Sequence, residues 1–185
     1  MRNDRTLLAE TCQATIIARC QQGDRDAQRQ LYESCHPKTY RLMVRMVGID
    51  DAADLTQRVF LQVFRKIGQF AGHAKLETWL HRVATNEALQ HLRHGRRHRA
   101  RSLQWEPVDG RPDRTLRLEQ RDLLRCSMQR LEPEQRSIFL LREVEELSYR
   151  EIAVTLGIPE GTVGSRLNRV RRALRHHLRE LGWDE

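Results

Sequence analysis

Apolar residues recur along most of this chain at steps of three and four, a spacing that places them on one face of an α-helix. The periodic segments cover residues 7–22, 25–47, 51–67 and 76–94. The second contains Pro37, which should kink that helix or mark a join between two pieces. No segment alternates apolar and polar residues convincingly enough to indicate a half-buried strand. The pattern therefore predicts an all-α fold.

Residues 95–116 interrupt the pattern. This segment contains Pro107 and Pro112, has no periodicity, and is longer than the loops of compact domains usually are. Fully extended, it could reach about 70 Å. Apolar periodicity resumes after it, so we expect two small helical domains, residues 1–94 and 117–185, joined by a flexible linker over residues 95–116.

The second domain contains a stretch, residues 147–174, with the pattern of two helices joined by a tight turn. Ser148 can cap the first helix while Glu151, three residues later, reciprocates. Gly157 can end that helix because it adopts a left-handed conformation without a Cβ penalty. Pro159 suits the first position of the next helix, where its missing N–H is harmless. We predict a helix-turn-helix.

The second helix of this motif has one narrow apolar stripe, which leaves its opposite face to solvent or to a ligand. A solvated face would normally include glutamates, yet none lies between Glu160 and Glu180. Hydroxyl, amide and guanidinium groups read base edges in a major groove, and arginines also contact phosphates. The pattern therefore favours nucleic acid over solvent. The polar face and its flanks carry Ser165, Arg166, Asn168, Arg169, Arg171, Arg172 and Arg175.

The charge balance points to the same kind of partner. The chain has 33 Lys and Arg against 25 Asp and Glu, and most of the cations are Arg, whose fork of donors fits phosphate and guanine. Residues 93–101 contain five arginines and two histidines and no acid, which indicates a disordered basic tail, a solvated helix end or a continuation of the nucleic-acid surface. No apolar run is long enough to cross a membrane and the N-terminus lacks an export signal, so we expect a cytoplasmic protein.

Other chemistry finds little support in the sequence. Cys12, Cys20, Cys35 and Cys126 show no C-x-x-C spacing and are expected to be reduced packing residues. A metal site could include the neighbours Cys35 and His36, but adjacent residues seldom chelate one ion well. The Walker, H-E-x-x-H and G-x-S-x-G motifs are missing. We expect no enzymatic activity, no cofactor and no metal.

Two long signatures, the first of them in two pieces, carry a family resemblance. The chain resembles domain 2 of the sigma-70 family over residues 51–70, DAADLTQRVFLQVFRKIGQF, and 76–93, LETWLHRVATNEALQHLR. It resembles domain 4 over residues 131–174, LEPEQRSIFLLREVEELSYREIAVTLGIPEGTVGSRLNRVRRAL. Because both signatures occur in the family's order and at its separation, the chain resembles a bacterial extracytoplasmic-function (ECF) sigma factor.

The resemblance implies a transcription initiation factor that binds core RNA polymerase through the clamp coiled coil and the flap. Residues 1–94, as domain 2, would bind core and recognise and open the −10 element of promoter DNA. Residues 117–185, as domain 4, would recognise the −35 element. The family also implies an anti-sigma factor that covers one or both domains, and no membrane insertion of the chain itself.

The resemblance also assigns residues by position. Asn86 falls where the family holds a base flipped out of the −10 strand, and its amide could bond such a base on two edges. Trp79 is expected in the core rather than as a stacking platform. Contacts with the clamp are expected from Asp54, Gln57, Arg58 and Leu61. Contacts with the −10 element are expected from Gly72, His73, Ala74, Lys75, Asn86, Gln90 and Arg93. Contacts with the −35 element are expected from Thr162, Ser165, Arg166, Asn168, Arg169, Arg172 and Arg175.

Four residues depart from the family pattern. Arg58 stands where the family usually has an acid, His81 where Tyr is common, and Glu146 where Gly often precedes the helix-turn-helix. Gly164 stands where Lys or Arg usually faces phosphate, and it costs its helix about 1 kcal/mol relative to Ala. Either the backbone approaches DNA closely at Gly164, or weaker binding at the −35 element is tolerated. We expect Arg58 to weaken the contact with core.

Two other classes of function compete with this interpretation. The first is a helix-turn-helix activator or repressor whose N-terminal bundle senses a ligand or metal through its cysteines. The second is a nucleic-acid enzyme such as a nuclease, which ranks last because the sequence shows no clustered carboxylates or histidine pair.

Overall fold

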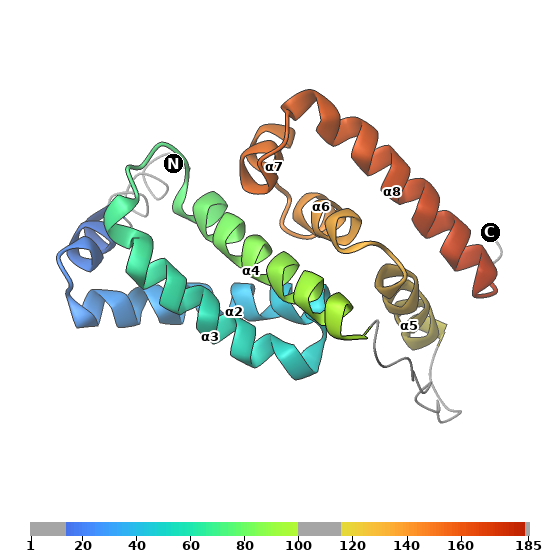
Figure 1. Ribbon diagram of the computed structural model, residues 1–185, viewed down its shortest axis with the longest axis horizontal. Helices are drawn as coiled ribbons and strands as arrows, with labels where there is room; N and C mark the ends of the chain where they lie inside the picture. Colours follow the sequence, from blue (N-terminus) through green and yellow to red (C-terminus); the bar gives the residue numbers. More distant parts are fainter. Residues whose placement is uncertain (1–13, 100–115, 184–185) are drawn as a thin grey trace. The chain divides into compact units, whose positions relative to one another are not determined.

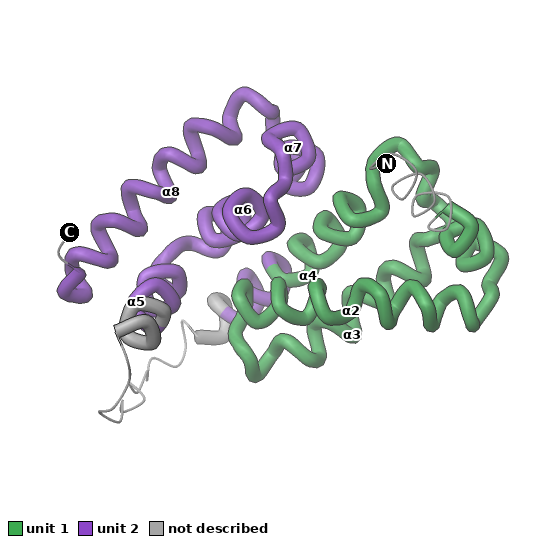
Figure 2. Tube along the Cα trace, turned by 180° about the vertical axis from the view of Figure 1, so that it is seen from behind, with its two compact units in different colours: residues 1–88 green, residues 89–185 purple. Residues whose placement is uncertain are grey.

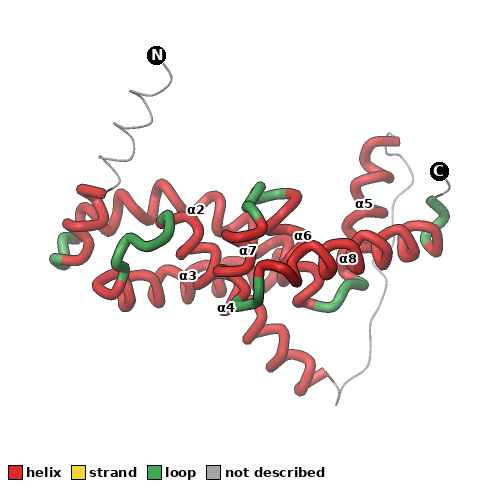
Figure 3. Tube along the Cα trace, turned by 90° about the horizontal axis from the view of Figure 1, so that it is seen from above, coloured by secondary structure: helices red, strands yellow, loops and turns green. Residues whose placement is uncertain are grey.

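The computed structural model describes residues 14–99 and 116–183 of the chain. Every regular element in these two ranges is a helix, which confirms the all-α prediction (Figures 1 and 3). After a helix over residues 14–21 come α2 (Arg25–Val47), α3 (Ile49–Lys66), the 3-10 turn η1 (Ile67–Gln69) and α4 (Leu76–Arg99). The later elements are α5 (Leu116–Gln129), α6 (Pro133–Glu143), α7 (Tyr149–Leu156) and α8 (Glu160–Glu180).

The chain divides into two compact units, residues 1–88 and 89–185, coloured separately in Figure 2. The division falls inside α4, which is one continuous helix. None of the described helices is long and apolar enough to cross a membrane.

The hairpin of α2 and α3 forms the framework of the first unit. Asp24 caps α2 because its carboxylate accepts hydrogen bonds from the amides of Asp26 (2.9 Å) and Ala27 (3.2 Å). The helix then continues through Pro37 as a single element of 23 residues, so the predicted join between two pieces is not observed. Gly48, with φ of 100°, makes the reversal into α3 in a conformation that favours glycine.

The core of the first unit lies between α2, α3 and the first half of α4. Its side chains follow the helical spacing that the sequence predicts, and each is less than a tenth exposed. They are Ala27, Leu31, Leu42, Met43, Met46, Ala52, Leu55, Val59, Phe60, Val63, Ile67, Leu76, Leu80, Ala84 and Ala88. Lys38 on α2 also pairs with Glu77 in the first turn of α4 at 3.2 Å, which links the two helices at the surface.

Two boundaries differ from those predicted. The last regular residue of α4 is Arg99, so residues 95–99 of the predicted linker are helical. Gly95 lies inside the helix, because one glycine costs only about 1 kcal/mol and does not by itself end a helix. Leu116, also assigned to the linker, is the first residue of α5. The predictions for residues 1–13 and 100–115, including that for Cys12, lie outside the described residues.

The second unit packs α5, α6 and α7 against the long helix α8. Leu131, Ile138, Leu141, Leu147, Ile152, Ala153, Val163, Leu167, Val170 and Leu174 form its core. Arg136 supports the end of α5, since its guanidinium donates to the carbonyls of Met128 (3.0 Å) and Gln129 (2.8 Å). Leu124, one of the apolar positions of the helical pattern, is 45% exposed and lies outside the core.

Candidate DNA and polymerase interfaces

The helix-turn-helix is formed by α7, a turn and α8. The predicted capping box is present, because the Ser148 hydroxyl accepts from the Glu151 amide (3.3 Å) and the Glu151 carboxylate accepts from the Ser148 amide (2.9 Å). Gly157 ends α7 in a left-handed conformation with φ of 64°, as predicted. Pro159 is the N-cap of α8 rather than its first residue, a difference of one position.

The apolar stripe and the polar face of α8 are separated as the sequence predicts. Val163, Leu167, Val170 and Leu174 are buried in the second core. The exposed residues on the other side include six of the seven predicted −35 contacts, and Thr162 is half-buried. The six are Ser165, Arg166, Asn168, Arg169, Arg172 and Arg175.

Two hydroxyls on this face already make hydrogen bonds within the helix. Thr162 donates to the Pro159 carbonyl at 2.7 Å, and Ser165 donates to the Thr162 carbonyl at 3.0 Å. Each oxygen keeps its lone pairs for a donor from outside. In this structure the two hydroxyls are therefore arranged to accept hydrogen bonds, whereas the neighbouring arginines can only donate.

Arg171 differs from the other arginines of α8. Its guanidinium donates to the Glu143 carboxylate of α6 at 2.8 Å, and this bond raises the pKa of Arg171 above its ordinary value. Because its charge is neutralised by a partner in the same unit, Arg171 joins α6 to α8 and is a weaker candidate for phosphate binding. The pairing was not predicted, since Glu143 and Arg171 are far apart in the sequence and belong to different helices.

Gly164 lies on the flank of α8 that faces α7. A Cβ built at this glycine would lie 3.5 Å from Cε2 of Tyr149, which is an ordinary van der Waals distance. The position therefore has room for a methyl group beside the tyrosine ring. A glycine is expected here either because DNA approaches the backbone closely or because weaker binding to the −35 element is tolerated. Neither reason includes the neighbouring ring of Tyr149.

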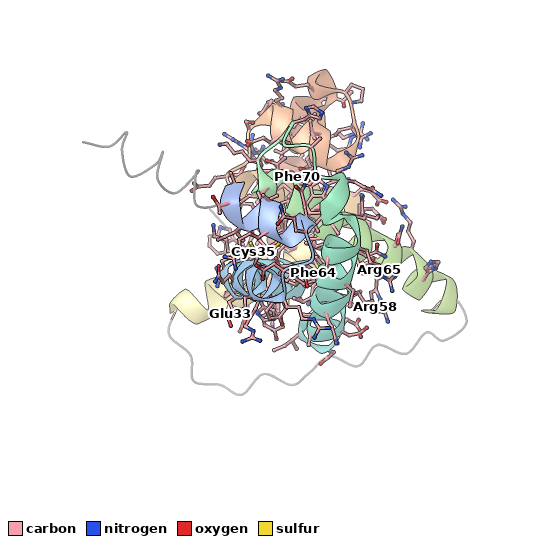
Figure 4. The ribbon with its side chains drawn as sticks, turned by 90° about the vertical axis from the view of Figure 1, so that its left-hand side faces the viewer. Glu33, Cys35, Arg58, Phe64, Arg65 and Phe70 are labelled. Carbon is pink, nitrogen blue, oxygen red and sulfur yellow. The ribbon has the colours of Figure 1, made fainter. Side chains whose placement is uncertain are left out.

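The residues predicted to contact core RNA polymerase lie on one exposed face of α3. Asp54, Gln57, Arg58 and Leu61 recur at steps of three and four and are all exposed, with Leu61 53% exposed despite its apolar side chain. Arg58 pairs with Asp54 at 2.8 Å, one helical turn apart. Figure 4 shows Arg58 on the side of α3 that faces away from α2.

The predicted −10 residues fall into two groups. Asn86, Gln90 and Arg93 are exposed on one face of α4, at steps of four and three. The loop at residues 72–75 directly precedes α4, so it lies about 15 Å along the helix axis from Asn86. The helix therefore brings the first group together and places the loop at its N-terminal end.

Gln21 was not recognised from the sequence, although it holds the chain that leads into this loop. Its side-chain amide donates to the carbonyls of Ile67 (3.1 Å) and Phe70 (2.9 Å), more than 40 residues away. Phe70 packs against Trp79 with ring centroids 5.4 Å apart. Trp79 is half-buried and lines a small apolar space beside core residues such as Leu31, as expected for a packing residue.

The described cysteines show no sign of metal chemistry. Cys20 is buried, Cys35 is half-buried and Cys126 is exposed, and burial raises the pKa of the first two thiols. Over residues 14–99 and 116–183, no three His, Cys, Asp or Glu side chains gather as metal ligands would.

The fold defines the class of this protein. It has two helical units, and the second contains a helix-turn-helix whose second helix exposes a basic face. Comparison with known families is more specific. Residues 31–98 match Sigma-70 region 2, and residues 121–174 match Sigma-70, region 4.

Several characterised proteins are similar over nearly the whole chain. The ECF RNA polymerase sigma factor SigW of Bacillus subtilis is 30% identical, and the alignment covers 89% of this chain and 96% of SigW. The RNA polymerase sigma-H factor of Pseudomonas aeruginosa is 32% identical, with 95% and 98% covered. The chain belongs to the ECF family of RNA polymerase sigma factors.

Solved structures share the fold at lower identity. The sigma factor RpoE of Bartonella quintana, in complex with the anti-sigma factor NepR, gives a TM-score of 0.66 at 24% identity, covering 82% of this chain and 96% of RpoE. CnrH, in complex with the cytosolic domain of CnrY, gives 0.64 at 21% identity, covering 90% and 96%.

Proposed function

We propose that this sigma factor binds core RNA polymerase through the exposed face of α3 and directs it to promoters through α4 and α8. Residues 1–94 act as domain 2 and residues 117–185 as domain 4, with residues 95–116 joining them. The observation that carries the proposal is α8, whose buried apolar stripe is matched by an exposed face of arginine, amide and hydroxyl groups. The factor itself is non-catalytic and acts where core polymerase does, in the cytoplasm.

The −35 element is the proposed ligand of α8. Arg166, Arg169, Arg172 and Arg175 make no ion pair within the described residues, so their positive charges are available to bases and phosphates. The Arg175 guanidinium also donates to the Arg171 carbonyl at 3.4 Å. This availability contrasts with Arg171, which is neutralised by Glu143. The proposed −35 contacts are Thr162, Ser165, Arg166, Asn168, Arg169, Arg172 and Arg175.

The −10 element is the proposed ligand of α4 and of the loop before it. Asn86 would bind a flipped base, and Gln90 and Arg93 would contact the strand beside it, since all three are exposed on one helix face. Gly72, His73, Ala74 and Lys75 would contact the DNA from the loop. Gln21 would support these contacts indirectly by fixing the chain at Ile67 and Phe70.

Two protein partners complete the proposal. Core polymerase would cover Asp54, Gln57, Arg58 and Leu61 with its clamp, and the flap would contact domain 4. An anti-sigma factor would inhibit the protein by covering one or both of these exposed surfaces. The exposed Leu61 is the apolar side chain of this face that a protein partner would cover.

Binding to core polymerase distinguishes this function from a helix-turn-helix activator or repressor. The purified chain should form a stable complex with core polymerase freed of all sigma factors, and a saturating resident sigma should displace it. Leu61→Asp should abolish complex formation without lowering the melting temperature, because Leu61 is exposed and lies outside the core of the first unit. An activator would instead bind only polymerase that already contains a resident sigma.

A further inference from the structure

The side chain of Gln21 holds one end of the loop that leads into α4. Gln21 is the last residue of the helix over residues 14–21, and its amide nitrogen donates to the carbonyl oxygens of Ile67 (3.1 Å) and Phe70 (2.9 Å). An amide nitrogen carries two N–H donors, so both are used on this short stretch of backbone. One side chain therefore fixes the 3-10 turn η1 at its first residue and at the residue that follows it.

The backbone that carries Gln21 is itself fixed. Cys20, its neighbour in the chain, is 2% exposed in the core of the first unit. The Arg19 guanidinium donates to the Asp24 carboxylate at 2.8 Å, and the Asp24 amide donates to the Arg19 carbonyl at 3.1 Å. These bonds close the turn between the first helix and α2, so Gln21 holds its two acceptors from a rigid position.

The other end of the loop is fixed by α4. Leu76, the first residue of α4, is only 5% exposed, and the Lys75 carbonyl accepts a hydrogen bond from the Trp79 amide at 3.1 Å. Between these two ends, residues 71–75 are mostly exposed and have no packed core of their own. The conformation of the loop therefore depends on how its two ends are held, and Gln21 holds one of them.

We propose that Gln21 is a positioning residue that sets which bases of the −10 element the loop accepts. The inference rests on the proposed contact of residues 72–75 with promoter DNA. A loop held in one conformation discriminates between bases, because a wrong base leaves polar groups unpaired, whereas a loose loop can adapt to several bases. Gln21 acts through the loop and needs no contact of its own with DNA.

Gln21→Ala removes both donors, and its effect should depend on the sequence of the −10 element. On a promoter that the wild-type holoenzyme opens, the variant should form open complexes about threefold to tenfold more slowly, the range expected for one net hydrogen bond. Discrimination between bases should fall at the positions where His73→Ala also lowers it, and should persist at the position that Asn86→Ala affects. The rate of abortive product formation on a panel of single-base −10 variants measures both effects.

Two further variants make the test specific. Gln22→Ala is the matched control, since Gln22 is the next residue and is also exposed, and it should keep the rates and selectivity of the wild type. Gln21→Glu keeps the size of the side chain, but a carboxylate cannot donate to a carbonyl, so its selectivity should fall as in Gln21→Ala.

The Gln21→Ala variant should bind core polymerase as the wild type does, which shows that its first unit is folded. Loss of core binding, or equal slowing on every −10 sequence, would indicate a general structural role and overturn the inference. Wild-type selectivity in Gln21→Glu would overturn it as well. Failure of the wild-type holoenzyme to open any promoter would instead refute the proposed function.

Discussion

The ion pair between Asp54 and Arg58 shows how one residue can change the charge of the surface proposed to contact core polymerase. The family resemblance implies an acid at position 58, but here the arginine lies 2.8 Å from Asp54 and neutralises it. Both side chains are more than half exposed, so the pair contributes little to folding. Its main consequence is for a partner, which meets a paired carboxylate in place of two free ones.

Arg58→Glu should therefore tighten binding to core polymerase. The substitution releases the Asp54 carboxylate and adds a second one, and complementary charge at an interface changes affinity by about threefold to tenfold. Arg58→Ala should give an intermediate gain, because it only releases Asp54. Competition against a second sigma factor for limiting core measures both. Equal or weaker binding by both variants would mean that the clamp surface is matched to Arg58.

Arg169 and Arg175 should behave differently although both are exposed arginines of α8. Arg169 is on the groove-facing side, so Arg169→Ala should cost about 1–3 kcal/mol at one base pair of the −35 element and relax discrimination there. Arg175 is nearer the C-terminal end on a flank, so Arg175→Ala should weaken binding to all sequences alike. A panel of −35 variants bound by holoenzyme distinguishes the two. Uniform losses for both would show that the base-reading and phosphate faces are wrongly assigned.

Asn86→Ala should slow promoter opening without affecting assembly with core. Asn86 is exposed on α4, whereas the face proposed to bind the clamp belongs to α3, and the Asn86 amide would hold only the flipped base. Losing that partner should reduce the rate of open-complex formation by about tenfold, since the cost of unstacking is no longer offset. Permanganate reactivity of −10 thymines over time measures it. Normal reactivity in the variant would remove Asn86 from the proposed site.

At the scale of whole helices, signals that are local in the sequence predicted the structure well. The capping box at Ser148, the left-handed Gly157 and the cap at Asp24 each depend on residues within four positions, so a single segment contains the information. The face of each helix followed from the same short spacing. For this reason the helical periodicity correctly predicted that α8 buries a narrow apolar stripe and exposes a polar face that includes Arg169.

Interactions between helices were not predictable in the same way. Arg171 resembles the other arginines on the flank of α8 in sequence, and only the crossing of α6 and α8 brings Glu143 within 2.8 Å of it. Gln21 gave no signal because its acceptors are backbone carbonyls in a distant segment. The neighbour of Gly164 is Tyr149, on another helix. Such pairs depend on how helices cross, which helical spacing alone does not specify.

The cap of α2 makes stability depend on pH in a defined direction. Hydrogen bonds from the Ala27 amide and from Arg19 lower the pKa of Asp24 below its ordinary value. A lowered pKa means that the ionised carboxylate stabilises the fold, fully at neutral pH and less as the pH falls below about 4. Asp24→Asn keeps a capping side chain but loses the charge. Its urea midpoint should therefore lie below that of the wild type at pH 7, and the gap should narrow under acidic conditions. If the difference between the two urea midpoints did not change with pH, the charge of Asp24 would have no role in stability.

At the scale of the molecule, each unit has a buried core of its own and carries at least one of the exposed surfaces proposed above to bind a partner. The first unit exposes the face of α3 proposed to contact core polymerase and the Asn86 face of α4, and the second exposes the basic face of α8. Separate surfaces suit a protein that would bind core polymerase and recognise the −10 and −35 elements at the same time. Under the proposed function, weak recognition at either element would be tolerable, because core polymerase would hold both units on the same DNA.

Mapping transcription start sites in a purified system is the most direct test of the proposed sigma-factor function. The chain and sigma-free core polymerase, mixed with fragmented genomic DNA and nucleotides, should produce transcripts with defined 5′ ends. Those starts should share −10 and −35 elements that differ from those of the resident sigma factor, and core alone should produce none. Transcripts that arise only after a resident sigma is added, or starts with no shared upstream elements, would contradict this function.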